Sequence, residues 1–353
     1  MNKIEKLRKS LGENNLDAIL ITSPYNRRYI TNFTGTAGVA IVSMNDSRFV
    51  TDFRYIEQAT EQAADFKIVE HKKPIHQVIN EQLKELGVQK VGFEKDHVTF
   101  STYELYEKTM DVKLVPVSGL VEELRLIKTA EELDVLKQAA NIAEDAFSHI
   151  QAYIKPGVKE IDISNELEFY MRKLGAESSS FDTIVASGYR GALPHGVASD
   201  KKIQSGELIT LDFGAYYNGY CSDITRTVAV GELDDEQMEI YNIVQEAQKR
   251  GVEGLKPGMT GIEADALTRD YITEKGYGEY FGHSTGHGVG LEVHEGPGLS
   301  FRSEKKLAPG MVVTVEPGIY VPEVAGCRIE DDIVITEKGY ERLTLAPKEL
   351  ITL

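Results

Sequence analysis

The strongest constraint on this chain is a weak internal repeat in its C-terminal two thirds. Lys155-Pro-Gly157 recurs as Lys256-Pro-Gly258, 101 residues later, and a helical pattern follows each copy. Farther along, Ser205–Asp212 aligns with Pro309–Glu316 at a spacing of 104 residues, matching a glycine, a threonine and a terminal carboxylate. Two copies are too few for a solenoid, which needs at least about three repeats. The repeat predicts two related halves packed face to face around one site; chance similarity of two helix-turn-strand units is the alternative.

A hairpin signal in the first half brings two acids together. Apolar, β-branched runs flank Asn218-Gly219, a dipeptide favoured in two-residue hairpin loops. With that loop, Asp212 faces Thr225, and Asp223 becomes the diagonal neighbour of Asp212 on the same sheet face, about 7 to 8 Å away. Like charges there are unfavourable unless a cation lies between them, and two metal ions about 3.5 to 4 Å apart suit the spacing. The alternatives are solvated acids on an exposed strand, or a bulge that changes the register.

The second half offers a comparable arrangement of acids. Glu316 ends an apolar, β-branched run, and Glu330 lies within Cys327–Val334. The period of two along a strand places Arg328, Glu330 and Asp332 on one face. An arginine beside Glu330 can orient carboxylates that bind a metal. An ordinary surface ion pair is the alternative for Arg328.

Histidines are concentrated in glycine-rich segments of the same region. His283 and His287 are four residues apart, but Gly282–Gly288 contains too much glycine for a stable helix. We expect a tight loop whose glycines let the backbone approach a ligand while an imidazole reaches a metal. A dinucleotide-binding loop does not fit, because the preceding strand, the following helix and the downstream acid that such a loop needs are missing.

The N-terminal third has a different pattern. Short β-branched runs at 17–22, 37–42 and 112–117 alternate with helical patterns such as 75–86, which predicts a small α/β domain. A capping box, Thr129 to Glu132, then opens a long amphipathic helix through about residue 150. Because 353 residues exceed the roughly 250 to 300 at which single cores stop growing, we expect two domains, 1–125 and 126–353.

Charge and composition exclude several classes of partner. The chain has 56 acidic and 39 basic residues, a formal net charge of −17, and no cluster of Lys and Arg that would suit nucleic acid. No apolar run approaches the ~18 residues of a membrane helix, and the N-terminus has no stretch of signal-peptide type. With only two cysteines, the chain fits a reducing, cytoplasmic location.

In this order and spacing, the motifs resemble those of the Xaa-Pro dipeptidase (prolidase) and aminopeptidase P family, which has the pita-bread fold. The resemblance covers the whole chain. It implies an α/β creatinase-like N-terminal domain followed by an α+β pita-bread catalytic domain with a pseudo-twofold repeat. In relatives the N-terminal domain helps to form a dimer, so we expect a homodimer. The segments that carry the resemblance are Leu211–Gly214, Cys221–Arg226, His283–Gly290, Val315–Tyr320 and Arg328–Asp332.

The resemblance also implies roles for individual residues. It makes His195, His294 and Glu316 catalytic, and it places His283, Tyr320 and Arg328 in the substrate pocket. Cys327 departs from the pattern, because a glycine or small aliphatic residue often precedes the Arg-Ile-Glu run; an oxidation-sensitive site and an inert buried thiol are its two interpretations. The implied metal ligands are Asp212, Asp223, His287, Glu316 and Glu330.

The activity that the resemblance implies is hydrolysis of the peptide bond preceding proline. A hydroxide bridging two divalent ions would attack that bond in an Xaa-Pro dipeptide or at the N-terminus of a short peptide. Mn²⁺ is the expected metal, with Co²⁺, Zn²⁺ and Fe²⁺ as alternatives. Competing interpretations are a methionine aminopeptidase-like or other aminopeptidase of the same fold, a metal-independent creatinase-like hydrolase, and a non-catalytic binding protein. The motifs do not determine the length of the substrate.

Overall fold

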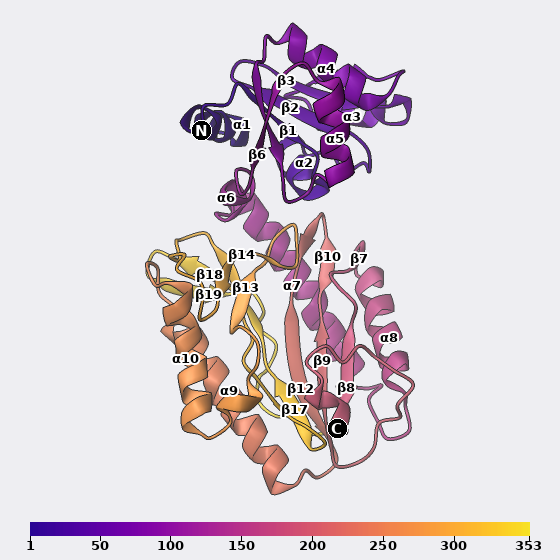
Figure 1. Cartoon of the computed structure of the whole chain (residues 1–353). Helices are drawn as coiled ribbons and strands as arrows, with labels where there is room; N and C mark the ends of the chain where they lie inside the picture. The colour runs from indigo at the N-terminus through magenta and orange to yellow at the C-terminus, as the bar shows by residue number, and fades with distance from the viewer. The chain divides into compact units, whose positions relative to one another are not determined.

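The chain divides into two compact units, Met1–Arg125 and Leu126–Leu353, in a computed structural model that describes every residue from Met1 to Leu353 (Figure 1). None of its helices combines the length and apolar character needed to cross a membrane.

The N-terminal unit is a six-stranded mixed sheet with helices, as the alternating patterns predicted. Its strand order is β4-β3-β2-β1-β5-β6; β1 runs antiparallel to β2 and parallel to β5. All four residues of β1 are apolar and buried, as expected for a central strand covered on both faces. The strands are β1 Ala18–Ile21, β2 Val39–Ser43, β3 Ser47–Thr51, β4 Lys67–Glu70, β5 Lys90–Glu94 and β6 Lys113–Val117. The helices are α1 Lys3–Glu13, α2 Pro24–Thr31, η1 Phe53–Tyr55, α3 Ile56–Gln62, α4 Ile75–Glu85, α5 Phe100–Thr109 and α6 Glu122–Arg125.

The first half of the second unit opens with the predicted capping box. The Thr129 side chain accepts from the Glu132 N–H, and the Glu132 side chain accepts from the Thr129 N–H, which confirms where this helix starts. Strands β12, β9 and β8 form one small sheet, and β11, β10 and β7 form another. The elements are α7 Ala130–Ile150, α8 Glu160–Lys173, β7 Ser178–Ser179, β8 Ile184–Ser187, η2 Gly188–Ala192, β9 Glu207–Phe213, β10 Ala215–Tyr217, β11 Tyr220–Cys221 and β12 Ile224–Val230.

The second half repeats this plan with two helices and another small sheet. Its five-stranded sheet has the order β14-β13-β15-β18-β19, and β16 pairs with β17. The elements are α9 Asp235–Gly254, α10 Gly261–Glu274, η3 Gly278–Tyr280, β13 Gly286–Gly288, β14 Glu295–Leu299, β15 Val312–Val315, β16 Gly318–Val321, β17 Ala325–Arg328, β18 Asp331–Thr336 and β19 Gly339–Arg342.

The internal repeat is visible in the turns and in the helix layers. Gly157 and Gly258 take left-handed conformations with φ of +90° and +88°, and α8 and α10 follow them. Helices α7 and α8 flank the strands on one side of this unit, and α9 and α10 flank them on the other (Figure 1). Helices α7 and α8 bury most of their apolar side chains against β8, β9 and β12, and α9 and α10 bury most of theirs against β14 to β18, so the strands lie between two helical layers. The prediction of two related halves is confirmed.

The predicted hairpin register is also confirmed. Tyr217 pairs with Tyr220 next to the Asn218-Gly219 turn, and Asp212 pairs with Thr225. The ladder is interrupted at Gly214, where β9 gives way to β10, but the register is the same on both sides. No bulge shifts Asp212 relative to Thr225.

The prediction for the histidine segment was partly wrong. Residues 282–285 lie outside regular structure, but Gly286–Gly288 forms the strand β13 instead of a tight loop. A Cβ on Gly286 would lie 1.9 Å from the Thr314 carbonyl oxygen. A Cβ on Gly288 would lie 1.9 Å from the Gly296 carbonyl oxygen. Close approach of neighbouring strands, and not of a ligand, therefore requires these two glycines.

Candidate metal centre

The two halves of the second unit join along a seam between β12 and the junction of β17 with β18. The Glu330 N–H donates to the Thr225 carbonyl at 3.1 Å. The Thr227 hydroxyl donates to the Arg328 carbonyl at 2.9 Å and lies 3.2 Å from the Arg328 N–H. Side chains of both halves meet along this seam because the backbones are hydrogen-bonded across it.

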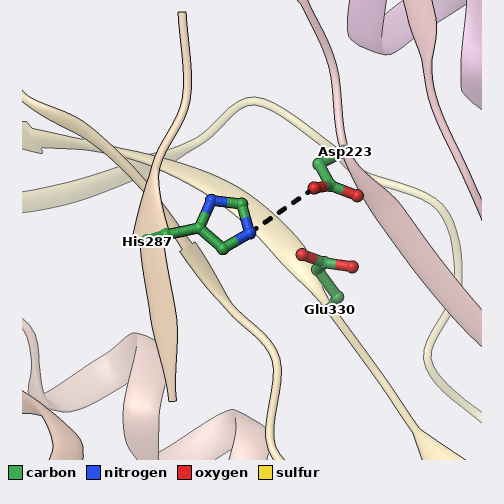
Figure 2. Close-up of side chains that lie close together, drawn as sticks. All are labelled: Asp223, His287 and Glu330. Atoms are coloured by element: carbon green, nitrogen blue, oxygen red, sulfur yellow. Dashed lines mark ion pairs between the residues drawn. The ribbon is translucent and has the colours of Figure 1, made fainter. Parts of the chain in front are cut away.

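Three predicted metal ligands converge at the seam. Asp223 lies between β11 and β12, Glu330 lies between β17 and β18, and His287 lies on β13. One potential ligand atom from each lies within 4.8 Å of the others. Figure 2 shows the His287 imidazole pointing toward both carboxylates, with its Nε2 3.7 Å from Asp223 Oδ2.

The other two predicted ligands lie beside this group. Asp212 sits on β9 and is 8% exposed. Glu316 follows β15 directly, and its Oε1 is 3.3 Å from His287 Nε2. The last pair of the β15–β18 ladder joins Val315 to Asp331, so one further step puts Glu316 opposite Glu330. All five residues line one cavity of about 570 Å³.

The acids of this cluster repel one another in the absence of a cation. Burial, followed by the charge of Glu330, raises the pKa of Asp223 well above its usual range. Burial and the charge of Glu316 do the same to the pKa of Glu330. Burial raises the pKa of Glu316 to about 8, although Arg328 opposes the shift. Burial also lowers the pKa of His287 to about 4, so its imidazole is neutral and can serve as a ligand.

Oxygen atoms without donors show that the cluster fits a metal. Asp212 Oδ1, Glu330 Oε1 and Asp332 Oδ1 are buried and accept no hydrogen bond. Buried carboxylate oxygens are costly unless a donor or a cation satisfies them. One imidazole among several carboxylates is a hard, oxygen-rich donor set, which suits divalent manganese, cobalt, iron or zinc.

Arg328 is buried, which excludes the surface ion pair considered from the sequence. It is 3% exposed, and one of its Nη atoms makes an ion pair with Asp212. Its other Nη donates to the Tyr320 hydroxyl at 2.6 Å and to the Pro194 carbonyl at 3.3 Å. The guanidinium lines the cavity and holds the Asp212 carboxylate on one side and the His195 segment on the other.

A directional chain of hydrogen bonds sets the tautomer of His283. Because the Tyr320 hydroxyl accepts from Arg328, it donates its own hydrogen to His283 Nε2 at 2.7 Å. The Nδ1–H of His283 then donates to the Ser284 carbonyl at 2.8 Å. Burial lowers the pKa of His283 to about 4, in agreement with a neutral ring. His283 lines the cavity, as predicted. Tyr320 does not line it; instead, its hydroxyl holds the His283 ring through this hydrogen bond.

The two histidines implied as catalytic also line the cavity. His294 packs edge-on against His287, with ring centroids 4.3 Å apart. His195 lies in the segment that connects β8 to β9. Both imidazoles therefore face the space next to the acid cluster.

Two residues that form hydrogen bonds with predicted ligands were given no role in the sequence analysis. The Thr225 hydroxyl donates to Glu330 Oε2 at 2.6 Å, and Asp332 Oδ2 accepts from the Asp223 N–H at 2.9 Å. The signals were present, because Thr225 faces Asp212 in the hairpin and Asp332 shares a strand face with Glu330. The alternation of side chains along a strand, however, does not predict which atom a side chain will hydrogen-bond.

Cys327 is a buried thiol. It is 0% exposed and packs in an apolar cluster with Ile319 and Ile329. Burial raises the pKa of its thiol to about 12, which suppresses the reactive thiolate. Of its two interpretations, the structure favours the inert thiol.

We expect the metal-free protein to lose stability as the pH rises from 7 to 8. Burial raises the pKa of both Glu316 and Asp332 to about 8, far above about 4 for an exposed carboxyl. The folded state then keeps protons that the unfolded state has already lost, so the free energy of unfolding falls with pH, by on the order of 1 kcal/mol per group. Thermal unfolding of metal-free protein should show a falling Tm.

Excess Mn²⁺ should abolish this fall, because a bound cation keeps the acids ionised in the folded state. Glu316→Gln should reduce the pH dependence of the metal-free protein by about half, because Asp332 still titrates. A metal-free Tm that stays constant or rises between pH 7 and 8 would contradict this electrostatic account of the cluster.

Two family models match this chain, and together they cover almost all of it. The model of "Metallopeptidase family M24" matches residues 134–337, and the model of "Creatinase/Prolidase N-terminal domain" matches residues 3–127. The chain is 60% identical to an uncharacterized peptidase of Bacillus subtilis, YqhT, over 99% of this chain and 100% of that protein.

Two solved structures are similar over almost the whole chain. The Xaa-Pro dipeptidase from Bacillus anthracis superposes with a TM-score of 0.99 at 63% identity, covering 99% of each chain. The X-Pro aminopeptidase from Thermotoga maritima superposes with a TM-score of 0.91 at 42% identity, covering 96% of this chain and 98% of the other.

Proposed function

Because the chain belongs to metallopeptidase family M24 and carries a creatinase/prolidase N-terminal domain, we propose that it hydrolyses the peptide bond preceding proline in Xaa-Pro dipeptides. The similarity to the Bacillus anthracis Xaa-Pro dipeptidase supports this substrate. The observation that carries the hydrolytic chemistry is the cluster of carboxylates around His287, with buried oxygens that lack donors.

The proposed cofactor is a pair of divalent ions, with Mn²⁺ as the first choice. Such ions, when bound, polarise the scissile carbonyl and lower the pKa of water, so that it becomes a nucleophile near neutral pH. The hard donor set is compatible with manganese, and the resemblance to the Xaa-Pro dipeptidase family makes it the first choice. The residues that would hold the pair are Asp212, Asp223, His287, Glu316 and Glu330.

Other side chains of the cavity would handle protons and charge. Glu316 would take a proton from the attacking water and pass it to the nitrogen of the leaving proline. His195 and His294 would donate hydrogen bonds to the developing oxyanion or to the substrate carboxylate. One well-placed donor contributes roughly 3 to 4 kcal/mol in comparable sites. Arg328 would keep Asp212 in place through its ion pair.

We also propose a homodimer in the cytoplasm. The match of residues 3–127 to a creatinase/prolidase N-terminal domain supports the dimer, which the resemblance to this family implies. The two cysteines, Cys221 and Cys327, are free, which is compatible with a reducing compartment.

A second candidate is removal of the first residue from longer Xaa-Pro peptides, which the similarity to the Thermotoga maritima X-Pro aminopeptidase favours. Rates on Leu-Pro, Leu-Pro-Ala and Met-Ala-Ser with added Mn²⁺ separate the possibilities. We expect Leu-Pro to be cleaved fastest, with kcat/KM at least about tenfold lower for the tripeptide, because an extra residue needs space and pairing that a dipeptide site does not offer.

An equal or higher rate on Leu-Pro-Ala would favour the aminopeptidase. Cleavage of Met-Ala-Ser without cleavage of Leu-Pro would replace both candidates with a methionine aminopeptidase-like activity. Metal-loaded protein that cleaves none of the three would contradict a peptidase function and favour a binding protein.

A further inference from the structure

A buried acid outside the metal cluster is tied to the segment that carries His195. Glu160 is the first residue of α8, and its side chain is 0% exposed. It lies in the middle of a set of donors, and its two carboxylate oxygens accept five hydrogen bonds. The donors are the N–H and hydroxyl of Ser187, the N–H and hydroxyl of Ser199, and the guanidinium of Arg190.

These donors come from both ends of one segment, residues 187–199, which we call the His195 loop. Ser187 ends β8 and donates to Glu160 Oε1 from its N–H at 2.9 Å and its hydroxyl at 2.8 Å. Ser199 donates to Oε2 from its N–H at 3.1 Å and its hydroxyl at 2.6 Å. Arg190 pairs with Oε2 and also donates to the Val197 carbonyl at 2.9 Å. One carboxylate therefore closes the loop.

The second support of the His195 loop is β17. A Cβ on Gly326 would lie 1.8 Å from the Gly191 carbonyl oxygen, so the two backbones are in contact. Arg328 donates to the Pro194 carbonyl, as described above. The outer side of the loop is open, with Tyr189 60% exposed and Leu193 52% exposed. Glu160 and β17 thus hold two sides of the loop, and near its end Val197 also pairs with Ile184 of β8.

The His195 imidazole depends on this support. It lines the cavity, and no hydrogen bond from another side chain holds the ring. Its place next to the metal cluster is therefore set by the backbone of the loop. A displacement of a catalytic group by about 1 Å can cost about a hundredfold in rate.

We propose that Glu160 is a positioning residue, which closes the His195 loop at both ends and thereby sets where the His195 imidazole meets the substrate. The inference rests on the proposed peptidase function for its effect on rate, but not for its effect on the loop. Glu160 itself does not line the cavity.

The second half of the molecule supports its histidine segment in a similar way. Asp265 on α10 is 1% exposed and accepts from the Thr285 N–H at 3.0 Å. Arg269, paired with Asp265, donates to the carbonyls of Phe281 and His283 at 3.0 and 2.7 Å. In each half, a buried acid on the helix after the Lys-Pro-Gly turn anchors a segment that carries a cavity histidine. The two acids are not at equivalent positions of the repeat. The halves therefore share the way in which the segment is anchored, but they do not use aligned residues for it.

The decisive variant is Glu160→Gln, which replaces one acceptor oxygen with an amide that donates. The amide then faces donors, so one end of the His195 loop is released. We expect amide hydrogen exchange in peptides covering residues 188–199 to become at least about tenfold faster in the Mn²⁺-loaded enzyme. We expect kcat/KM for Leu-Pro to fall by about 10- to 100-fold with the metal content unchanged.

A double-mutant cycle separates positioning from general damage. In a His195→Ala background, Glu160→Gln should cause little further loss of rate, because the residue that it positions is already gone. The matched control is Glu166→Gln, on the same helix, whose carboxylate pairs with His149 and not with the loop. It should leave both the exchange and the rate unchanged. If Glu160→Gln does not fold, Ser199→Ala removes one donor and should show the same pattern with an effect of about threefold to tenfold.

Unchanged hydrogen exchange in residues 188–199 would overturn the proposal. If Glu160→Gln lowers the rate equally in the wild-type and His195→Ala backgrounds, the proposal is overturned as well, because the loss then does not depend on the His195 imidazole. Wild-type enzyme that fails to cleave Leu-Pro would refute the proposed function instead, and the exchange measurement would still decide whether Glu160 holds the loop.

Discussion

Replacing Asp223 with asparagine is expected to remove bound metal and to lower the rate of Xaa-Pro hydrolysis by at least about 10³-fold. Asp223 faces both His287 and Glu330 at the centre of the cluster (Figure 2). An amide cannot supply the negative charge that compensates a divalent ion in a buried site. Metal content by elemental analysis and kcat/KM for Leu-Pro measure the two effects.

The same substitution should not unfold the protein. In the metal-free state the Asp223 carboxylate is repelled by neighbouring acids, so removal of its charge relieves repulsion, and the Tm of metal-free protein should stay constant or rise. Asp182→Asn is the matched control, because Asp182 is an exposed acid that lines the same cavity. It should keep the metal. Folded Asp223→Asn protein with full metal content would refute the ligand assignment.

Replacing Asp331 with asparagine is expected to lower the free energy of unfolding by about 3 to 5 kcal/mol. Asp331 is 0% exposed, and three cations surround it: Arg226 at 2.7 Å, Lys348 at 3.0 Å and Arg342 at 3.1 Å. Burial alone would raise the pKa of Asp331, but the three cations lower it below its usual range. Without the carboxylate, these charges are left close together without a counter-charge.

This ion cluster also stands next to the metal site. Arg226 donates to the backbone carbonyl of Glu330, so it connects Asp331 with a proposed metal ligand. For a domain of this size, the expected loss corresponds to a fall in Tm of about 6 to 20 °C. Thermal and denaturant unfolding of the metal-loaded protein measure it.

Glu246→Gln is the control for the stability prediction. Glu246 pairs with Arg250 one helical turn away, and both side chains are well exposed, at 39% and 49%. An exposed helical pair of this kind contributes only about 0.3 to 0.5 kcal/mol. A loss for Asp331→Asn no larger than that of the control would show that the three cations find other partners or water.

The sequence alone was enough for features that depend on neighbours along the chain. The Asn218-Gly219 turn sets the register that pairs Asp212 with Thr225, because a two-residue loop leaves only one alignment of its strands. The capping box at Thr129 starts α7 through bonds between residues three apart. Alternation along a strand separated Glu330, which faces the metal cluster, from Asp331, which faces the ion cluster.

Features that depend on packing between distant segments needed the tertiary structure. Gly286 and Gly288 were expected to make room for a ligand, but the strands beside them, from other parts of the chain, take that room. Nothing near Glu160 in sequence predicts that it binds Ser187 and Ser199, which lie 27 and 39 residues away. Local propensity and periodicity say which face a side chain occupies. Which residues that face contacts is decided only when the two halves pack together. The hydrogen bonds between the halves join segments that are far apart in the sequence, so no local turn or periodic pattern predicts them.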